Sequence, residues 1–211
     1  MQVADILQIE IEAESLAEAI ERGMRHFRCS RAAIEARILQ APSSGFIGLF
    51  GRKPAKVRIA LMDRGFAARA IVERLISLSG FTARVAGETM VPPYLLKLDS
   101  ADPSLLIGRH GQTLDSLQFL LNALLDKQLG PGESVLLDVA AYRERRQGDL
   151  ATLAQRLIGK ARRTGKTVST PPLPIEERKV LYGLIEREPD IVAHSRGQGA
   201  EKKLVVSAHR G

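Results

Sequence analysis

The stretch LLIGRHGQTLDSLQFLLN, residues 105–122, is the most informative part of the chain. A short apolar segment leads into the loop GRHG at 108–111, and a helix with leucines at helical spacing follows the loop. Two glycines let a backbone turn tightly and approach a ligand closely, and the start of a helix offers unpaired N–H groups and a positive dipole end. Arg109 and His110 add donors. The loop is therefore predicted to clamp a phosphodiester backbone; the alternative is a helix corner that needs glycine for geometry alone.

The G-x-x-G pattern occurs three times, so only its context makes it informative. Chance gives about one or two such matches in a chain with 18 glycines. GFIG at 45–48 and GLFG at 48–51 enclose apolar residues, whereas GRHG encloses two donors. The third match is thus the one that predicts a binding loop.

Elements around this loop are predicted in the order helix, strand, strand, helix, loop, helix, strand. Periodicity and glycine or proline breaks place them at 66–79, 81–86, 94–98, 104–107, 112–127 and 134–139, with Leu114, Leu117, Leu121 and Leu124 on one helix face. Before them, strands at 6–11, 34–39 and 57–62 flank a helix capped by Ser15. After them come helices at 142–164 and 175–188 and strands at 191–194 and 204–207. The prediction is an α+β chain of three small domains, at about 1–62, 63–140 and 141–211.

The positive charge is concentrated in the last third of the chain. The chain has 31 Lys and Arg against 24 Asp and Glu, a net charge of +7. Residues 1–62 carry +2, residues 63–139 carry −2, and residues 140–211 carry +7. Such a segment predicts a polyanionic partner, most often a nucleic acid, with a solvated basic face as the alternative.

Basic residues along the helix at 142–164 and just beyond it are the candidates for phosphate contacts. Arg162, Arg163 and Lys166 are predicted to make such contacts. For Arg143, Arg145 and Arg146 a second interpretation stays open, in which they pair with Glu144 and Asp149.

Enzymatic classes find little support in the sequence. GKARRTGKT at 159–167 has one residue too many for a P-loop and ends a predicted helix instead of following a strand. The four histidines show no metal-ligand spacing, and Cys29 is a lone cysteine that is predicted to be structural. We therefore expect no catalytic residue, no metal and no cofactor.

The termini and hydropathy suggest the compartment. The N-terminus is acidic and does not resemble a signal peptide, and no run of about 18 apolar residues predicts a transmembrane segment. One cysteine suits a reducing compartment, so a cytoplasmic protein is expected.

Three motifs carry a resemblance to a known family. LLIGRHGQTLDSLQFLLN resembles the KH-domain signature of the Jag/KhpB family, also called SpoIIIJ-associated protein. DVAAYRERR at 138–146 is similar to the junction after that domain, and GFIGLFGRKPAKVRI at 45–59 is similar to the Jag N-terminal domain. The resemblance implies that the central domain is a type II KH fold, whose element order is helix-strand-strand-helix-helix-strand.

The third domain resembles the R-three-H (Arg-x-x-x-His) domain, a binder of single-stranded nucleic acid. In LPIEERKVLYGLI at 173–185, Arg178 occupies the arginine position, and Tyr182 stands where the family has histidine. Residues four apart share a helix face, so both can reach one strand, and a tyrosine can stack on a base. The alternative is that Tyr182 packs in the core beside Leu181 and Ile185.

The resemblance implies a non-catalytic binder of single-stranded RNA, acting as an RNA chaperone or post-transcriptional regulator in cell elongation, cell shape and peptidoglycan homeostasis during envelope growth. It also implies a small single-KH partner protein, similar to KhpA, an association with the YidC/SpoIIIJ membrane insertase, and recruitment of a cytoplasmic protein to the membrane or division site. The predicted RNA contacts are Ile107 (the floor of a base groove), Gly108, Arg109, His110, Gly111 and Gln112 of the KH loop, together with Arg162, Arg163, Lys166, Arg178 and Tyr182.

The alternative function is a protein-assembly adaptor with weak RNA binding. The negative balance of residues 63–139 favours it slightly. The apolar loop GFIGLFG at 45–51 would then be a patch for a protein or membrane surface, unless it fills the core.

Overall fold

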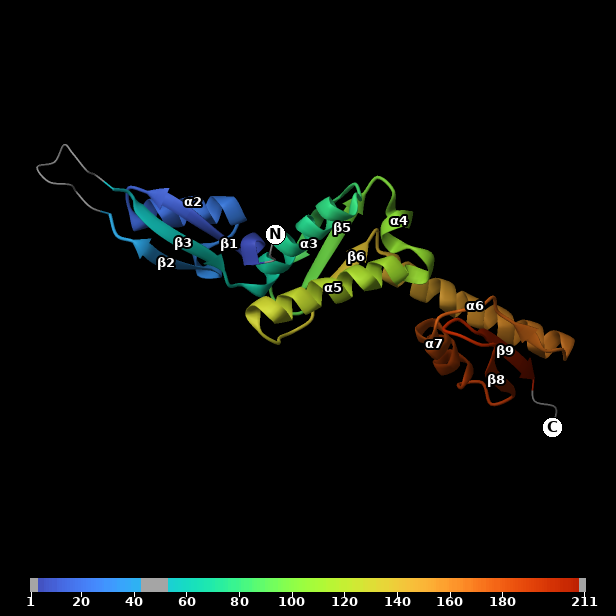
Figure 1. Ribbon diagram of the computed structural model, residues 1–211. Helices are drawn as coiled ribbons and strands as arrows, with labels where there is room; N and C mark the ends of the chain where they lie inside the picture. Colours follow the sequence, from blue (N-terminus) through green and yellow to red (C-terminus); the bar gives the residue numbers. More distant parts are fainter. Residues whose placement is uncertain (1–3, 43–52, 209–211) are drawn as a thin grey trace, which may run out of the picture. The chain divides into compact units, whose positions relative to one another are not determined.

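The computed structural model describes residues 4–42 and 53–208 (Figure 1). The chain forms two compact units, residues 1–140 and 141–211. The described residues form three small sheets, each covered by helices, so the predicted α+β class is confirmed. Both of the first two predicted domains fall in the first unit, and the three-domain division stays a prediction. The loop GFIGLFG at 45–51 lies outside the described residues.

The chain begins with an antiparallel sheet in the order β1-β3-β2 (Gln8–Ala13, Ala55–Leu61 and Ile34–Gln40). β3 is central, and its Val57, Ile59 and Leu61 are buried, as alternation along the strand predicts. Helix α2 (Leu16–Phe27) packs on this sheet, and the Ser15 hydroxyl caps it by accepting from Glu18 N at 3.2 Å. Residues 4–7 form the short helix α1 (Ala4–Leu7), so the strand predicted from residue 6 begins at Gln8. A short 3-10 turn, η1 (Arg31–Ala33), precedes β2.

Elements of the central module follow in the predicted order. They are α3 (Arg64–Ser79), β4 (Ala83–Thr89), β5 (Leu95–Ser100), α4 (Pro103–Ile107), the turn η2 (Arg109–Gly111), α5 (Gln112–Leu129) and β6 (Leu136–Val139). β4 and β5 are antiparallel, and β5 and β6 are parallel. A parallel pair needs a crossover connection, which α4 and α5 supply, and the GRHG loop lies in the middle of that crossover. This is the type II KH order.

The buried face of α5 differs by one residue from the predicted one. Leu114, Leu117 and Leu121 are buried as expected, but the fourth member is Leu125, whereas Leu124 is only half-buried. Residue 125 lies eleven residues after Leu114, about three full turns at 3.6 residues per turn, so it returns to the same face more closely than residue 124.

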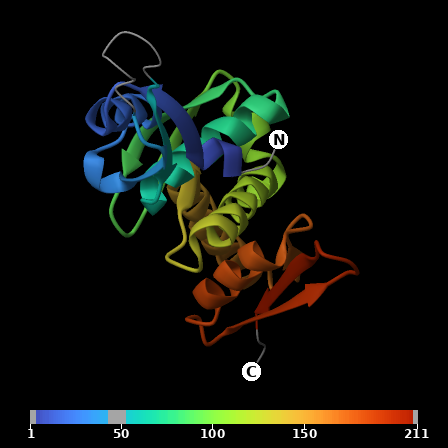
Figure 2. The ribbon, with the colours of Figure 1, turned by 60° about the vertical axis from the view of Figure 1, so that its left-hand side comes forward.

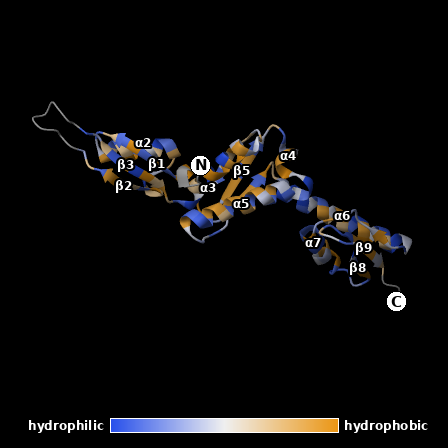
Figure 3. Cartoon of the chain, in the orientation of Figure 1, coloured by the Kyte–Doolittle hydropathy of each residue, from blue (hydrophilic) through white to orange (hydrophobic). Residues whose placement is uncertain are grey.

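The second unit packs two helices on a sheet in the order β7-β9-β8. Its elements are α6 (Tyr142–Thr164), β7 (Val168–Ser169), α7 (Ile175–Ile185), β8 (Ile191–Arg196) and β9 (Lys203–Ala208). Apolar and polar residues alternate along α6 (Figure 3), and Figure 2 shows α7 beside the β8–β9 hairpin. The apolar residues form one core cluster: Leu150, Ala154, Leu157, Ile158, Ala161, Leu173, Leu181, Ile185, Ile191, Leu204 and Val206.

Alternation along β8 and β9 fixes which side chains face the helices. Ile191 and Ala193, like Leu204 and Val206, contact the core, so their neighbours along each strand point to the opposite face of the sheet.

α7 ends at Ile185, three residues earlier than predicted, because the Glu188 N–H bonds back to the Ile185 carbonyl at 2.9 Å in a tighter turn. None of the described helices has the length and apolar character needed to cross a membrane.

Candidate nucleic-acid interface

Two constraints make glycine necessary at the first position of the GRHG loop. Gly108 has φ 71° and ψ −176°, a conformation open essentially to glycine alone. A Cβ built on Gly108 would lie 2.1 Å from Thr113 Oγ1 and 2.8 Å from Thr113 Cβ. Gly111 also has positive φ, at 84°. The geometric need for glycine is therefore real, and it holds whether or not the loop binds a ligand.

Several backbone N–H groups of the loop already donate hydrogen bonds to nearby backbone carbonyls. Gly108 N donates to Ser104 O at 2.8 Å, Gly111 N donates to Gly108 O at 3.3 Å, and Gln112 N donates to Arg109 O. The prediction that the start of the helix offers unpaired N–H groups is therefore wrong for Gly111 and Gln112. The turn inside the loop uses these two N–H groups, so neither of them is left to donate to a phosphate.

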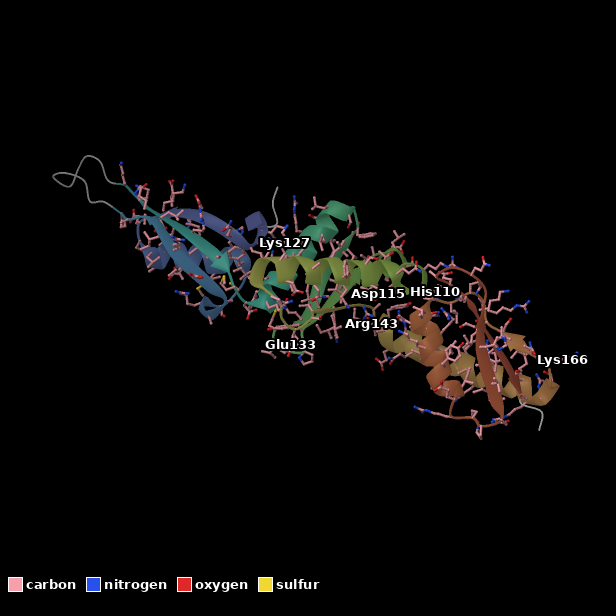
Figure 4. The ribbon with its side chains drawn as sticks, turned by 60° about the horizontal axis from the view of Figure 1, so that its bottom comes forward. His110, Asp115, Lys127, Glu133, Arg143 and Lys166 are labelled. Atoms are coloured by element: carbon pink, nitrogen blue, oxygen red, sulfur yellow. The ribbon has the colours of Figure 1, made fainter. Side chains whose placement is uncertain are left out.

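Arg109 is exposed and His110 is half-buried, with a left-handed φ of 54°. Figure 4 shows His110 at the start of α5. Ile107 is half-buried at the end of α4, beside the fully buried Leu106. The structure thus brings the loop residues together, and the role of Ile107 as the floor of a base groove stays a prediction.

Phe119 is a surface feature that the sequence reasoning missed. Its side chain is 74% exposed on α5, next to Leu120, in a shallow depression that also contains Asp115. An aromatic residue that falls off the leucine face of an amphipathic helix is the signal that could have found it.

Arg178 is buried, in contrast to the surface position expected for it. The residue is only 8% exposed, its Nε donates to the Leu173 carbonyl at 3.2 Å, and its Nη1 donates to Ser195 Oγ at 2.6 Å. Nη2 makes no hydrogen bond to any described residue, yet no buried side-chain nitrogen or oxygen in the described part of the chain lacks a partner. Nη2 therefore keeps some contact with solvent, while Nε and Nη1 are held by hydrogen bonds within the protein.

Tyr182 lies one turn after Arg178, and both side chains converge on β8. The Tyr182 hydroxyl is 3.0 Å from Ser195 Oγ, and its partly buried ring packs against the core cluster. Ser195 is thus the residue that links the two motif positions, and the sequence reasoning did not identify it.

The basic residues at the end of α6 fall into two groups. Arg162 pairs with Glu188 and Asp190, and its pKa is raised by those hydrogen bonds, so two carboxylates already neutralise its charge. Arg163 and Lys166 are exposed and make no ion pair with a described residue. Lys166 follows the end of α6 (Figure 4). The predicted phosphate contacts here rest on Arg163 and Lys166 more than on Arg162.

Arg146 has a partner that neither sequence interpretation considered. Its Nε and Nη2 donate to the two carboxylate oxygens of Glu177 at 2.6 and 2.8 Å. This hydrogen bonding raises the pKa of Arg146. The pair joins α6 to the buried start of the motif helix, so Arg146 has a structural role.

Asp190 should titrate below the ordinary aspartate range. Arg162 Nε donates to its Oδ2 at 2.7 Å, which lowers the pKa of the carboxyl. A lowered pKa in the folded state stabilises the fold above about pH 4, the ordinary value for aspartate, and that contribution is lost as the pH falls through the lowered pKa. NMR titration of Asp190 should give a midpoint below the ordinary value for aspartate, and Arg162→Gln should raise it. An unchanged midpoint in the variant would refute the pairing.

Comparison with known proteins places these features in a family. Residues 11–61 match the family described as Jag N-terminus, and residues 149–208 match the R-three-H domain. The chain is 28% identical over 200 residues to RNA-binding protein KhpB of Bacillus subtilis (strain 168), which covers 92% of this chain and 94% of the relative. It is also 28% identical over 208 residues to RNA-binding protein KhpB of Clostridium symbiosum, covering 96% and 92%. With a Jag N-terminus, the KH element order, an R-three-H domain and near full-length similarity to these relatives, the chain is similar to the Jag/KhpB family over nearly its whole length.

Proposed function

We propose that the chain binds single-stranded RNA and catalyses no reaction. The observation that carries the proposal is the motif cluster of Arg178, Tyr182 and Ser195. A guanidinium fixed by two internal hydrogen bonds, whose Nη2 has no hydrogen-bond partner among the described residues, is preorganised to donate to a phosphate. The name that the relatives carry, RNA-binding protein, supports the same ligand.

The second unit and the central module would make different contacts with the RNA. In the second unit, Arg178 Nη2 would bind one phosphate, with Arg163 and Lys166 supplying long-range attraction. The exposed part of the Tyr182 ring would contact a base. In the central module, Arg109 and His110 would contact the backbone beside Ile107 and Gln112.

The proposed biological role follows the family resemblance. The chain would act as an RNA chaperone or post-transcriptional regulator in cell elongation and envelope growth. It would do so with a small single-KH partner, and recruitment to the membrane near the YidC/SpoIIIJ insertase would place it where envelope growth occurs.

Arg109→Asp is expected to weaken binding of a fluorescent single-stranded RNA by about tenfold or more, because a hydrogen bond to a charged group contributes about 1.5–3 kcal/mol. Fluorescence anisotropy on the full chain measures the dissociation constant. Arg37→Asp is the matched control, since it makes the same charge change on the exposed strand β2, opposite Arg58. Equal affinities for both variants would remove the KH loop from the RNA interface.

A protein-assembly adaptor is the second candidate function. The exposed Phe119 beside Leu120 favours it, since an exposed aromatic on a helix is a common anchor in protein interfaces. Loss of binding to a single-KH partner in Phe119→Ser, with RNA affinity unchanged, would favour this second function.

A further inference from the structure

Within the described residues, both helices of the second unit pack on the same face of its sheet. α6 and α7 contribute to a core cluster whose strand members, Ile191, Leu204 and Val206, all point to one face. Strand alternation therefore directs Arg196 of β8 and Lys203 of β9 to the opposite face. Arg196 and Lys203 are directly paired in the register, so two positive charges are neighbours across the strands.

This face carries a groove of about 580 Å³ at the hairpin end of the sheet, which we call the hairpin groove. Three cationic residues and one carboxylate, Glu201, are among its lining. Arg196 and Lys203 make no ion pair with a described residue. The three cations are Arg196, Lys202 and Lys203. The hydroxyls of Thr167 and Ser169 and the apolar side chains of Pro172 and Val205 also line the groove.

We propose that the hairpin groove binds a backbone phosphate of single-stranded RNA. The proposal rests on the proposed function and adds a second contact surface to it. Like charges opposite each other on neighbouring strands repel, and an anion between Arg196 and Lys203 relieves that repulsion. The Ser169 and Thr167 hydroxyls can donate to the same phosphate, while Pro172 offers an apolar surface for the sugar or base.

The groove and the motif cluster occupy the same end of the sheet. Ser195, which holds Arg178, and Arg196, which lines the groove, are consecutive residues of β8 on opposite faces. Their backbones are adjacent, and their side chains point to opposite faces of the sheet. A strand of several nucleotides that passes around the hairpin end would contact Arg178 on one face and the groove on the other.

The charge of the lining favours a polyanion over an apolar peptide, and a phosphodiester supplies both the charge and the sugar that the groove suits. An acidic protein segment is the competing occupant. It would share the charge and lack the preference for a nucleic acid, so the test includes polyglutamate as a competitor.

The test compares two double variants of the full chain. Arg196→Gln with Lys203→Gln removes two charges from the groove. Arg25→Gln with Arg37→Gln removes two charges from exposed positions of the first unit, on α2 and β2, where no RNA contact is proposed. At 0.1 M salt, loss of two phosphate contacts should raise the dissociation constant for single-stranded RNA about twentyfold and reduce the slope of log affinity against log salt by about 1.4. The control should change the constant less than about threefold.

Each outcome bears on the proposal. Equal losses in the two variants would mean a general charge effect and would overturn the groove. Unchanged affinity in the groove variant, with Arg178→Ala still impaired, would overturn the groove and leave the proposed function standing. Displacement of the RNA by polyglutamate at an equal concentration of charge would mark an acidic-protein site and overturn the RNA assignment. Absence of RNA binding by the unmodified chain would overturn the proposed function and the groove with it. Thermal melting of all variants checks that they fold.

Discussion

Gly108→Ala is expected to lower the free energy of unfolding by about 3 kcal/mol or more. The backbone conformation of Gly108 is open essentially to glycine alone, which costs another residue about 1–3 kcal/mol. The new methyl would also lie 2.1 Å from Thr113 Oγ1, and relieving such overlap costs about 1–3 kcal/mol more. Urea unfolding followed by circular dichroism measures the loss.

Gly148→Ala is the control for this substitution. Gly148 lies inside α6, and a Cβ built on it meets no atom within 4 Å. Alanine in a helix interior should therefore raise stability by about 0.5–1 kcal/mol. If Gly108→Ala unfolds at the same urea concentration as the unmodified chain, the loop does not have the described geometry. A folding defect at Gly108 also means that an acidic residue there would test stability together with binding, so Arg109→Asp is the cleaner probe of the loop.

The order of the central elements could be predicted because local signals mark each boundary. Asp102 caps α4 with Pro103 at its first position, and Gly108 and Gly130 end helices. These signals act within a few residues, so one sequence contains all of them. The short strand β7 was missed because two residues carry no period, and its existence depends on pairing with β9 more than thirty residues later.

The candidate site was predictable only in part for a related reason. The shared helix face of Arg178 and Tyr182 follows from their spacing of four. Their common partner does not, because Ser195 reaches them through the packing of α7 on β8. The carboxylate partners of Arg162 and Arg146 are likewise 26 to 31 residues away in sequence, so only the tertiary fold decides which arginines are neutralised and which remain for a phosphate.

Arg178→Ala is expected to weaken single-stranded RNA binding by about 10- to 100-fold, corresponding to the loss of one hydrogen bond to a charged group at about 1.5–3 kcal/mol. Arg178→Lys should weaken RNA binding as well, although it keeps the positive charge. A lysine ammonium is a point charge without the planar fork that bonds Leu173 O and Ser195 Oγ while leaving Nη2 for a phosphate. Lys179→Ala, at the exposed neighbouring residue, makes the same charge change and should alter affinity little.

Substitutions of Tyr182 distinguish a phosphate-binding role from a base-stacking role in the same anisotropy assay. If the hydroxyl matters because it holds Ser195 under Arg178, Tyr182→Phe should lose part of the affinity that Arg178→Ala loses, and the two losses should not add in the double variant, because they act on one contact. If the ring matters by stacking, Tyr182→Phe should retain affinity, while Tyr182→Ala should lose about 1–3 kcal/mol of binding free energy. A core role alone predicts early melting of Tyr182→Ala, with normal RNA affinity in the protein that remains folded. Full affinity in both Arg178→Lys and Tyr182→Phe would mean that charge alone attracts the RNA, and the cluster around Ser195 would then be only a structural tie between α7 and β8.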